Sequence, residues 1–382
     1  MARKIAGLML LSGSREAGLT IRLEGDVYQA QGIKLLDRGR GKEGRALLVR
    51  AAERHRAASS LSRSDGSLYL AEATDWIRIM EADDESGSSI AEGQEGALRA
   101  AEQAIAASPR DAAGPQLRAW ALWRIGYAKL GRGQDGEPDF KKSVESAQAA
   151  IDLNPDDWES YYFYALGESG LATVKDSRGE DADPLRLRTL EYLRKSIKLN
   201  RGFAWAWNDM GLLYFNLFAS STQRGIYVDE YFSNALSAFQ EAIRWDHNYS
   251  NPFANMISLY SEKIDYLYQH GKTFDADAAK AKEAGERLLA VKGDRSTACL
   301  NTVFIGLQTL EHLVLTRTEP HSLGPQIAQA SRAIEDCRRV DAKNTILDYN
   351  EATFQLLQAR NELTAGRSPE PFIEEGLRVV QQ

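Results

Sequence analysis

The sequence predicts an all-α fold, a right-handed α-solenoid of about eight antiparallel helix pairs. Two observations predict it: glycines that recur every 46 residues, and apolar positions that recur with the same period and with helical spacing. The glycines occupy positions 41, 87, 133, 179, 225 and 271, and arginine precedes four of them, as Arg40, Arg132, Arg178 and Arg224. A fixed period of this length is typical of a repeat array, in which neighbouring units share one continuous core.

The apolar series predicts the second helix of each unit. Within each set the spacing is i, i+3, i+7, which places three side chains on one stripe of a helix. The sets are Leu98, Ala101 and Ile105; Val144, Ala147 and Ile151; Leu190, Leu193 and Ile197; Leu236, Phe239 and Ile243.

The first helix of each unit lies between one such stripe and the next Arg-Gly pair, for example from Trp158 to Ser177. We expect the repeated glycine to end this helix in the left-handed conformation that other residues resist. The arginine before it suits the negative end of the helix dipole, and Asp135 and Asp181, three residues after Arg132 and Arg178, are its expected partners. The Arg-Gly pair therefore has an expected structural role.

The whole chain, residues 1–382, is expected to form a single helical repeat array. Residues 1–13 are expected to hold a lone helix (half a repeat or an N-terminal cap), and residues 14–294 six regular units of 46 residues. After Gly271 the register drifts, and residues 295–382 are expected to form two divergent helix pairs that act as a C-terminal cap, with helices at 298–315, 325–340, 346–364 and 369–380. An array that begins half-way through a unit leads us to expect an upstream segment or domain.

The composition narrows the choice of partners and compartment. The net charge is −7 and no dense Lys/Arg block occurs, which argues against nucleic acid as a partner. The only cysteines, Cys299 and Cys337, are too few for a disulfide framework and lack C-x-x-C spacing, which favours a reducing, cytoplasmic location. No apolar run approaches the roughly 18 residues of a membrane span.

A search for catalytic residues finds no constellation, so the chain is not expected to be an enzyme or to hold a metal or cofactor. The string G-x-G-x-x-G at Gly39, Gly41 and Gly44 links two helical patterns instead of following a strand. The five histidines show no ligand spacing, and the carboxylates Asp83 and Asp84 lie in a connector, where a solvated charge run is the ordinary explanation.

Two stretches resemble the tetratricopeptide repeat. In "AWAWNDMGLLY", Trp207, Met210, Gly211 and Tyr214 match its first helix, and in "ALSAFQEAIRWD", Ala235, Phe239, Ala242 and Ile243 match its second. The resemblance is clear over most of residues 62–292 and weak on either side. It implies an array that binds a protein or peptide along the concave face lined by its first helices.

The period departs from that family, whose repeats have about 34 residues. The longer connectors "GRGQDGEP" and "SRGEDADP" resemble those of the repeat regions that follow the catalytic domain in myxobacterial-type serine/threonine protein kinases. This resemblance implies a recruitment or regulatory module of a larger signalling protein, with a possible kinase domain upstream. The kinase motifs H-R-D and D-F-G are absent from the chain itself.

Three expected first helices open with runs of aromatic residues, "RAWALW", "YYFY" and "FAWAW". Consecutive helical residues point about 100° apart, so such runs cannot all face the core. The family's ligand-contacting positions, carried over from Ile125, Leu166 and Met210, are the following: Trp120, Trp123, Tyr161, Tyr164, Trp205 and Asn208.

Two alternatives stay open. The aromatic runs are either groove residues, partly exposed on one concave face, or extra core rings of the lengthened helices. The array is either a scaffold for a protein or peptide partner or an architectural module that self-associates. The oligomeric state in solution distinguishes the scaffold from the architectural module: a monomer favours the scaffold, and a dimer favours the architectural module.

Overall fold

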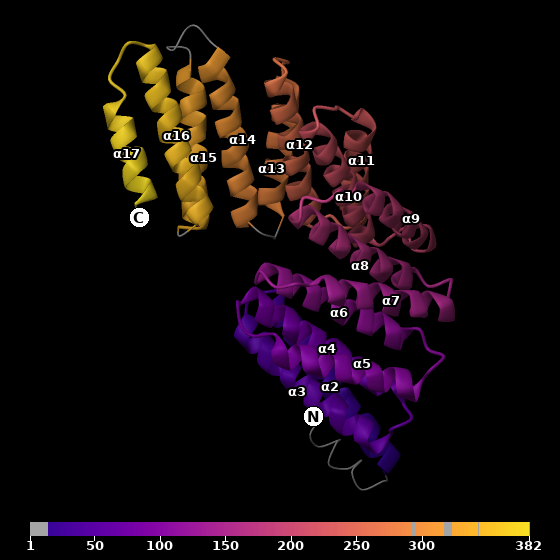
Figure 1. Ribbon diagram of the computed structural model, residues 1–382. Helices are drawn as coiled ribbons and strands as arrows, with labels where there is room; N and C mark the ends of the chain where they lie inside the picture. Colours follow the sequence, from indigo (N-terminus) through magenta and orange to yellow (C-terminus); the bar gives the residue numbers. More distant parts are fainter. Residues whose placement is uncertain (1–13, 292–294, 317–322, 343, 382) are drawn as a thin grey trace. The chain divides into compact units, whose positions relative to one another are not determined.

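The computed structural model describes residues 14–291, 295–316, 323–342 and 344–381, and in these ranges it contains sixteen α-helices and no strand (Figure 1). The predicted all-α array of about eight helix pairs is confirmed. The helices are α2 (Ser14–Leu36), α3 (Gly41–Leu61), α4 (Gly66–Glu85), α5 (Ala91–Ala107), α6 (Ala113–Gly131), α7 (Glu137–Leu153), α8 (Trp158–Ser177), α9 (Asp183–Leu199), α10 (Ala204–Gln223), α11 (Asp229–Trp245), α12 (Asn251–Gln269), α13 (Asp275–Ala290), α14 (Arg295–Thr316), α15 (Gly324–Val340), α16 (Thr345–Thr364) and α17 (Glu370–Val380).

The helix bounds follow the sequence patterns closely. Helix α8 spans Trp158–Ser177, as predicted, and α14 to α17 coincide with the four helices expected in the divergent region to within a few residues. The helix expected between Ala2 and Leu11 lies outside the described residues, as does position 317, where the glycine series breaks. None of the described helices combines the length and the apolarity that crossing a bilayer requires.

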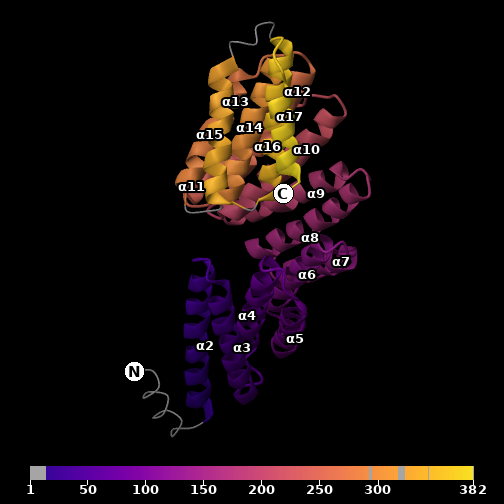
Figure 2. The ribbon, with the colours of Figure 1, turned by 90° about the vertical axis from the view of Figure 1, so that its left-hand side faces the viewer.

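The chain divides into two compact units, one up to Arg201 with α2 to α9, and one from Gly202 with α10 to α17. In each unit the even-numbered helices, which are the first helices of the pairs, contact one another in succession, and each also packs on its own odd-numbered partner (Figures 1 and 2). Each unit therefore has a row of first helices, and the surface of this row is the place to look for a binding site.

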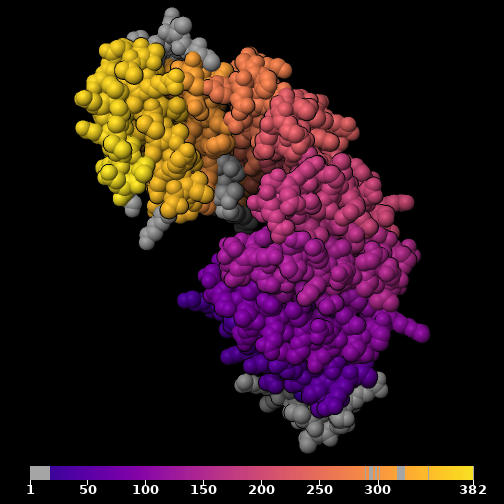
Figure 3. Space-filling model, in the orientation of Figure 1, coloured from indigo at the N-terminus to yellow at the C-terminus, as the bar shows by residue number. Residues whose placement is uncertain are grey.

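The ring of Phe140 packs against glycines of two neighbouring helix pairs. Phe140 of α7 is fully buried, and a Cβ added to Gly126 of α6 would come within 2.7 Å of its ring. A Cβ at Gly170 of α8 would come within 2.3 Å of the same ring. The ring thus fills space that two glycines leave open, one in its own pair and one in the next, and neighbouring pairs of a unit pack closely (Figure 3).

The repeated glycines adopt the left-handed conformation, with one correction. Gly87, Gly133, Gly179, Gly225 and Gly271 have φ between 63° and 75°. At the C-terminus of α6, Gly133 N–H donates to Leu130 O and Gln134 N–H donates to Lys129 O, which is the Schellman arrangement.

Gly41 does not follow the series, and its expected left-handed role was wrong. It is the first residue of α3, and the left-handed residue of that connector is Gly39, with φ of 73°. Helix α2 ends at Leu36, three residues before the position that corresponds to Glu85 in the 46-residue period, so the turn that follows it also comes earlier. Gly366 adds a further left-handed glycine after α16.

Two arginines of the Arg-Gly pairs, Arg132 and Arg178, bind the preceding helix pair. Arg178 Nη1 lies 2.7 Å from Glu137 Oε2, and its Nη2 lies 3.8 Å from Asp135 Oδ1. Arg132 likewise reaches Asp84, at 2.8 Å. The expected pairing with an aspartate three residues later was wrong. The partners belong to the preceding helix pair: Asp84 lies in the last turn of α4 and not, as expected, in a connector, and Glu137 is the first residue of α7. These exposed ion pairs contribute little to stability, because solvent screens them.

Cys299 of α14 and Cys337 of α15 are joined by a disulfide bond. Both side chains are buried, and they belong to the hydrophobic core around Val303, Leu307 and Ile334. Two cysteines are too few for a disulfide framework, as expected, but they suffice for this single bridge between the two helices of a pair, which the sequence analysis did not predict.

Candidate functional site

A stack of side chains runs across three first helices of the unit that ends at Arg201. The Arg78 guanidinium carbon of α4 lies 4.9 Å from the ring centroid of Trp120 on α6. Trp120 in turn stacks on Phe163 of α8, with centroids 6.1 Å apart and ring planes 20° apart. We call these residues the Arg78–Trp120–Phe163 stack. Trp120 is half-buried, so the stack holds the ring in place and leaves part of it accessible.

Polar contacts accompany the stack on the same row. Arg78 Nη1 donates to Glu81 Oε2 at 2.9 Å, and Arg124 Nε lies 3.6 Å from Glu81 Oε1. Further along, the hydroxyls of Tyr127 and Thr173 are 3.4 Å apart. The row of this unit therefore combines aromatic faces with fixed hydrogen-bonding groups, a composition suited to holding a peptide backbone and its side chains.

Trp123 takes a different direction from Trp120. Its ring meets Tyr127 edge-on, with centroids 5.2 Å apart, and Tyr127 meets the buried Phe140 of α7 in the same manner at 5.1 Å. These contacts lead into the core between α6 and α7. Trp123 is half-buried, and besides Tyr127 its ring contacts the Arg124 guanidinium, whose carbon lies 5.6 Å from the ring centroid.

Tyr161 and Tyr164 face α9 rather than the neighbouring first helix. The ring of Tyr164 stacks on Tyr192 with centroids 3.9 Å apart, and Tyr161 lies 6.4 Å from the same ring. Lys195 Nζ lies 5.5 Å from Tyr161 and 5.0 Å from Tyr192. Burial, and then the hydrogen bond with Tyr192, raises the pKa of Tyr164.

Trp120 contacts neighbouring first helices, whereas both tyrosines contact Tyr192, so the expectation that they share one face with Trp120 stays a prediction. The stack with Tyr192 turns Tyr161 and Tyr164 toward the second helix of their own pair. The same "YYFY" run does supply a residue of the row, but that residue is Phe163.

In the unit that begins at Gly202, Trp205 is exposed and Asn208 is buried. Trp205 is 52% exposed, and its ring stacks on Tyr249, with centroids 5.8 Å apart and ring planes 14° apart. Asn208 is 2% exposed, and its Oδ1 accepts a hydrogen bond of 2.8 Å from Asn255 Nδ2. The expected exposure of Asn208 was wrong, because its amide is used to join α10 to α12.

Sequence reasoning missed four residues of these clusters: Arg78, Phe163, Tyr192 and Tyr249. One signal was available, since Arg78 and Arg124 are 46 residues apart and so occupy equivalent positions of successive first helices. Tyr192 gave no comparable signal, because which second-helix ring meets Tyr164 depends on how α8 and α9 pack.

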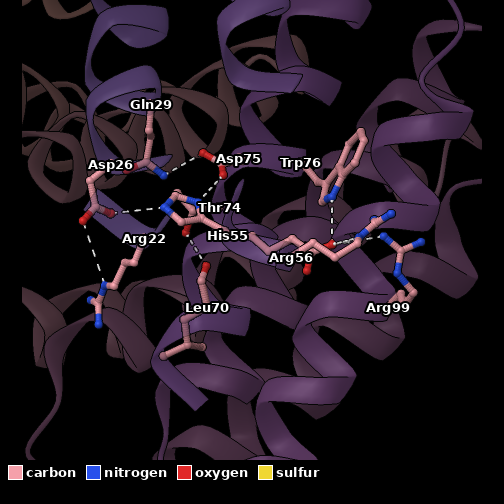
Figure 4. Close-up of polar contacts among 11 residues, drawn as sticks. Arg22, Asp26, Gln29, His55, Arg56, Leu70, Thr74, Asp75, Trp76 and Arg99 are labelled. Atoms are coloured by element: carbon pink, nitrogen blue, oxygen red, sulfur yellow. Dashed lines mark hydrogen bonds and ion pairs between the residues drawn. The ribbon is translucent and has the colours of Figure 1, made fainter. Parts of the chain in front are cut away.

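A buried polar network joins α2, α3 and α4 (Figure 4). His55 lies between two carboxylates: Nδ1 is 2.6 Å from Asp75 Oδ2, and Nε2 is 3.2 Å from Asp26 Oδ1. His55 and Asp75 are both fully buried, and Gln29 Nε2 donates to Asp75 Oδ1 at 2.8 Å. A Cβ at Gly25 would come within 2.5 Å of His55 Nε2, so this glycine makes room for the ring. No nucleophile adjoins the imidazole among these partners, and we assign the network a structural role.

No protein-family model matches the chain, and no curated protein matches it. Among solved structures, a thermophilic TPR protein of Thermus thermophilus is similar with 13% identity and a TM-score of 0.41, over 62% of this chain and 98% of that one.

Two further solved structures show the range of similar proteins. PilF of Pseudomonas aeruginosa has 13% identity and a TM-score of 0.42, over 74% of this chain and 98% of that one. The human IFIT1 dimer with m7Gppp-AAAA has 12% identity and a TM-score of 0.46, over 96% of this chain and 78% of that one. At these identities and scores the likeness carries no assignment, and the all-α array of helix pairs rests on the chain's own helices.

Proposed function

We propose that this array is a non-catalytic scaffold that binds a protein or peptide along its first helices. The observation that carries the proposal is Trp205, which is half exposed while its ring is held parallel to Tyr249. A preordered aromatic ring buries much area on binding and loses little conformational entropy, and for this reason tryptophan is frequent at binding hot spots.

The Arg78–Trp120–Phe163 stack supports the same function in the other unit. It presents a half-buried indole between a guanidinium and a second ring, next to the carboxylate of Glu81. We propose Trp120 and Trp205 as ligand contacts. Trp123, Tyr161 and Tyr164 contribute by holding the rings beside them, and Asn208 by joining α10 to α12.

The signalling context is also a proposal. The long connectors resemble those of kinase-associated repeats, which supports a recruitment or regulatory module, with a kinase domain as a possible partner upstream. The net charge of −7 favours protein over nucleic acid as the ligand.

Two features favour different cellular locations. The low cysteine count favours the cytoplasm, whereas the Cys299–Cys337 bond favours an oxidising compartment. Whether the two cysteines are oxidised in the isolated protein therefore tests the location.

Self-association is the second candidate function, and one observation favours it. Helices α16 and α17 carry large apolar side chains that are exposed, namely Ile346, Tyr349, Leu356, Leu363, Ile373, Leu377 and Val380. Exposed apolar residues gathered on two helices are typical of an interaction surface.

Two measurements test these proposals on the full chain. Selection of peptides from a random twelve-residue library displayed on phage should enrich sequences whose binding is lost in Trp205→Ala. Light scattering after size-exclusion chromatography should give a monomer. Failure to enrich any peptide, together with a dimer that Leu377→Glu dissociates, would replace the scaffold by the architectural function.

A further inference from the structure

A hollow of about 210 Å³ lies between the first helices α12 and α14. Its lining residues are Ser258, Ser261, Glu262, Asp265, Phe304 and Gln308. Pockets that enclose a whole small molecule usually measure about 300–1,000 Å³. This hollow is smaller than that range and suits a single long side chain of a bound partner.

The hollow carries two carboxylates and no basic side chain in its lining. Glu262 and Asp265 are three residues apart on α12, so both project toward the same side of the helix. Neither forms an ion pair with any of the residues that the structure describes. Lys263, next to Glu262 in sequence, is directed elsewhere: its Nζ lies 3.0 Å from Asp277 Oδ1 and 4.4 Å from the centroid of Phe232.

The neighbours of both carboxylates fix them in place without neutralising them. Gln308 Nε2 of α14 donates to Asp265 Oδ1 at 2.9 Å, and Thr222 Oγ1 of α10 donates to Glu262 Oε1. Asp265 is exposed as a residue, but partial burial of its carboxyl raises its pKa, and the Gln308 hydrogen bond offsets only part of that effect. A carboxylate that neighbouring atoms partly desolvate gains more from an approaching cation than one in bulk water.

Other charged groups around the hollow do not alter its sign. The charges of Glu311 on α14 and of Asp265 raise the pKa of Tyr268, and the charge of Arg360 on α16 lowers it, so all three charged groups lie near this ring. Arg360 is exposed and makes no ion pair within the described ranges. Within the lining itself, the charge is negative.

Phe304 supplies the apolar wall of the hollow. Its side chain is 43% exposed, which is unusual for a phenylalanine on a first helix of this unit: Phe218 is fully buried and Phe253 is 5% exposed. A lysine or arginine side chain has an apolar stem and a cationic head, and it matches a wall of this kind next to a pair of carboxylates.

We infer that this hollow is a specificity subsite that receives one lysine or arginine side chain of a bound peptide. The stem of that side chain lies on Phe304, and its charged group lies between Glu262 and Asp265. The inference rests on the proposed peptide-binding function and adds the chemistry that the ligand must carry. Charge complementarity selects this occupant, because the lining has negative charge to be neutralised and no cation of its own.

The test uses the full chain and peptides enriched from the random twelve-residue phage library at about 0.15 M salt, where long-range attraction is screened. The enriched peptides should share a lysine or arginine. A synthetic copy of the most enriched peptide should bind the double variant E262Q/D265N about tenfold more weakly than the wild type. The matched control is E283Q/E286Q on α13, which removes two exposed carboxylates of the same unit and should change the affinity less than about twofold.

A second arm replaces the basic residue of the peptide by citrulline or acetyllysine, which keeps the length and removes the charge. This change should weaken binding to the wild type about tenfold and should have almost no effect on binding to E262Q/D265N. Thermal melts of both double variants check that they fold.

Three outcomes overturn the inference. If the enriched peptides carry no shared cation, or if E283Q/E286Q weakens binding as much as E262Q/D265N, the hollow is not a cation subsite. If removal of the peptide's charge weakens binding to E262Q/D265N as much as it weakens binding to the wild type, the cation binds elsewhere. In each case binding that still depends on Trp205 leaves the proposed function standing, whereas a library that enriches no peptide at all contradicts both.

Discussion

His55 Nδ1 lies 2.6 Å from Asp75 Oδ2 within the core formed by α2, α3 and α4, and neither side chain is reached by solvent. Burial alone would lower the pKa of His55, but the hydrogen bonds and charges of Asp75 and Asp26 outweigh burial and raise it. Burial raises the pKa of Asp75, and the hydrogen bond with His55 offsets only part of this effect. The folded protein therefore binds protons at this pair more tightly than the unfolded chain does.

This relationship predicts that stability falls as pH rises. The contribution of His55 is fully present below its ordinary pKa of 6.5 and is lost as pH rises through the raised pKa of the folded state. Urea unfolding near pH 6 and near pH 9 should show that the wild type loses more free energy of unfolding between the two pH values than His55→Gln does.

Asp26→Asn provides a milder variant, because Asp26 is partly exposed and, of the His55 ring, contacts only Nε2; its other ion pair is with Arg22, at 3.9 Å. It should reduce the pH dependence without abolishing it. Parallel stability curves for the wild type and both variants would show that the network does not titrate in this range.

The glycine caps give a second prediction. Gly179 has φ of 71°, and a Cβ there would meet nothing within 4 Å, so any cost of Gly179→Ala comes from the backbone. The substitution should lower the free energy of unfolding by about 1 kcal/mol. Gly41→Ala is the matched control: a Cβ at Gly41 also meets nothing, but its φ is not positive, so stability should be almost unchanged or slightly higher. Equal melting temperatures for the two variants would be incompatible with a left-handed cap at Gly179.

The disulfide gives a third prediction. Cys299 and Cys337 are 38 residues apart, and a cross-link that closes a loop of this size stabilises a fold by up to about 4 kcal/mol. The isolated chain, denatured without reductant, should have no titratable thiol. Reduction should lower the melting temperature of the wild type and leave that of the double variant C299S/C337S unchanged. Two free thiols in the native protein would instead agree with a reducing compartment.

The fold could be predicted from the sequence because its signals are local and repeated. A left-handed glycine and an i, i+3, i+7 apolar stripe each depend on residues within one repeat. Both signals recur every 46 residues, so several copies support the same prediction. The exception, Gly41, occurs where the connector is shortened. The boundaries of the six regular units and the capping role of the last two pairs stay predictions.

The candidate site could be predicted only in part, because side-chain direction depends on packing between helices. Trp205 is exposed as expected, whereas Asn208, three residues later, is turned toward Asn255 of the next first helix. The direction of Tyr164 is set by Tyr192, which lies on the second helix 28 residues further along the chain. Neither contact can be predicted from the sequence alone, because both depend on how neighbouring helices pack.

The central claim is that Trp205 belongs to a binding surface and not to the core, and one paired measurement on Trp205→Ala tests it. Binding of the library-derived peptide should weaken by about 1–4 kcal/mol, the range for an aromatic hot spot. The free energy of unfolding should fall by no more than about 1.5 kcal/mol, the contribution of the stacking on Tyr249. Trp76→Ala, at a site only 6% exposed, should by contrast cost about 3–5 kcal/mol of stability. A Trp205→Ala protein that loses as much stability as Trp76→Ala, or that binds the peptide as the wild type does, would contradict the account.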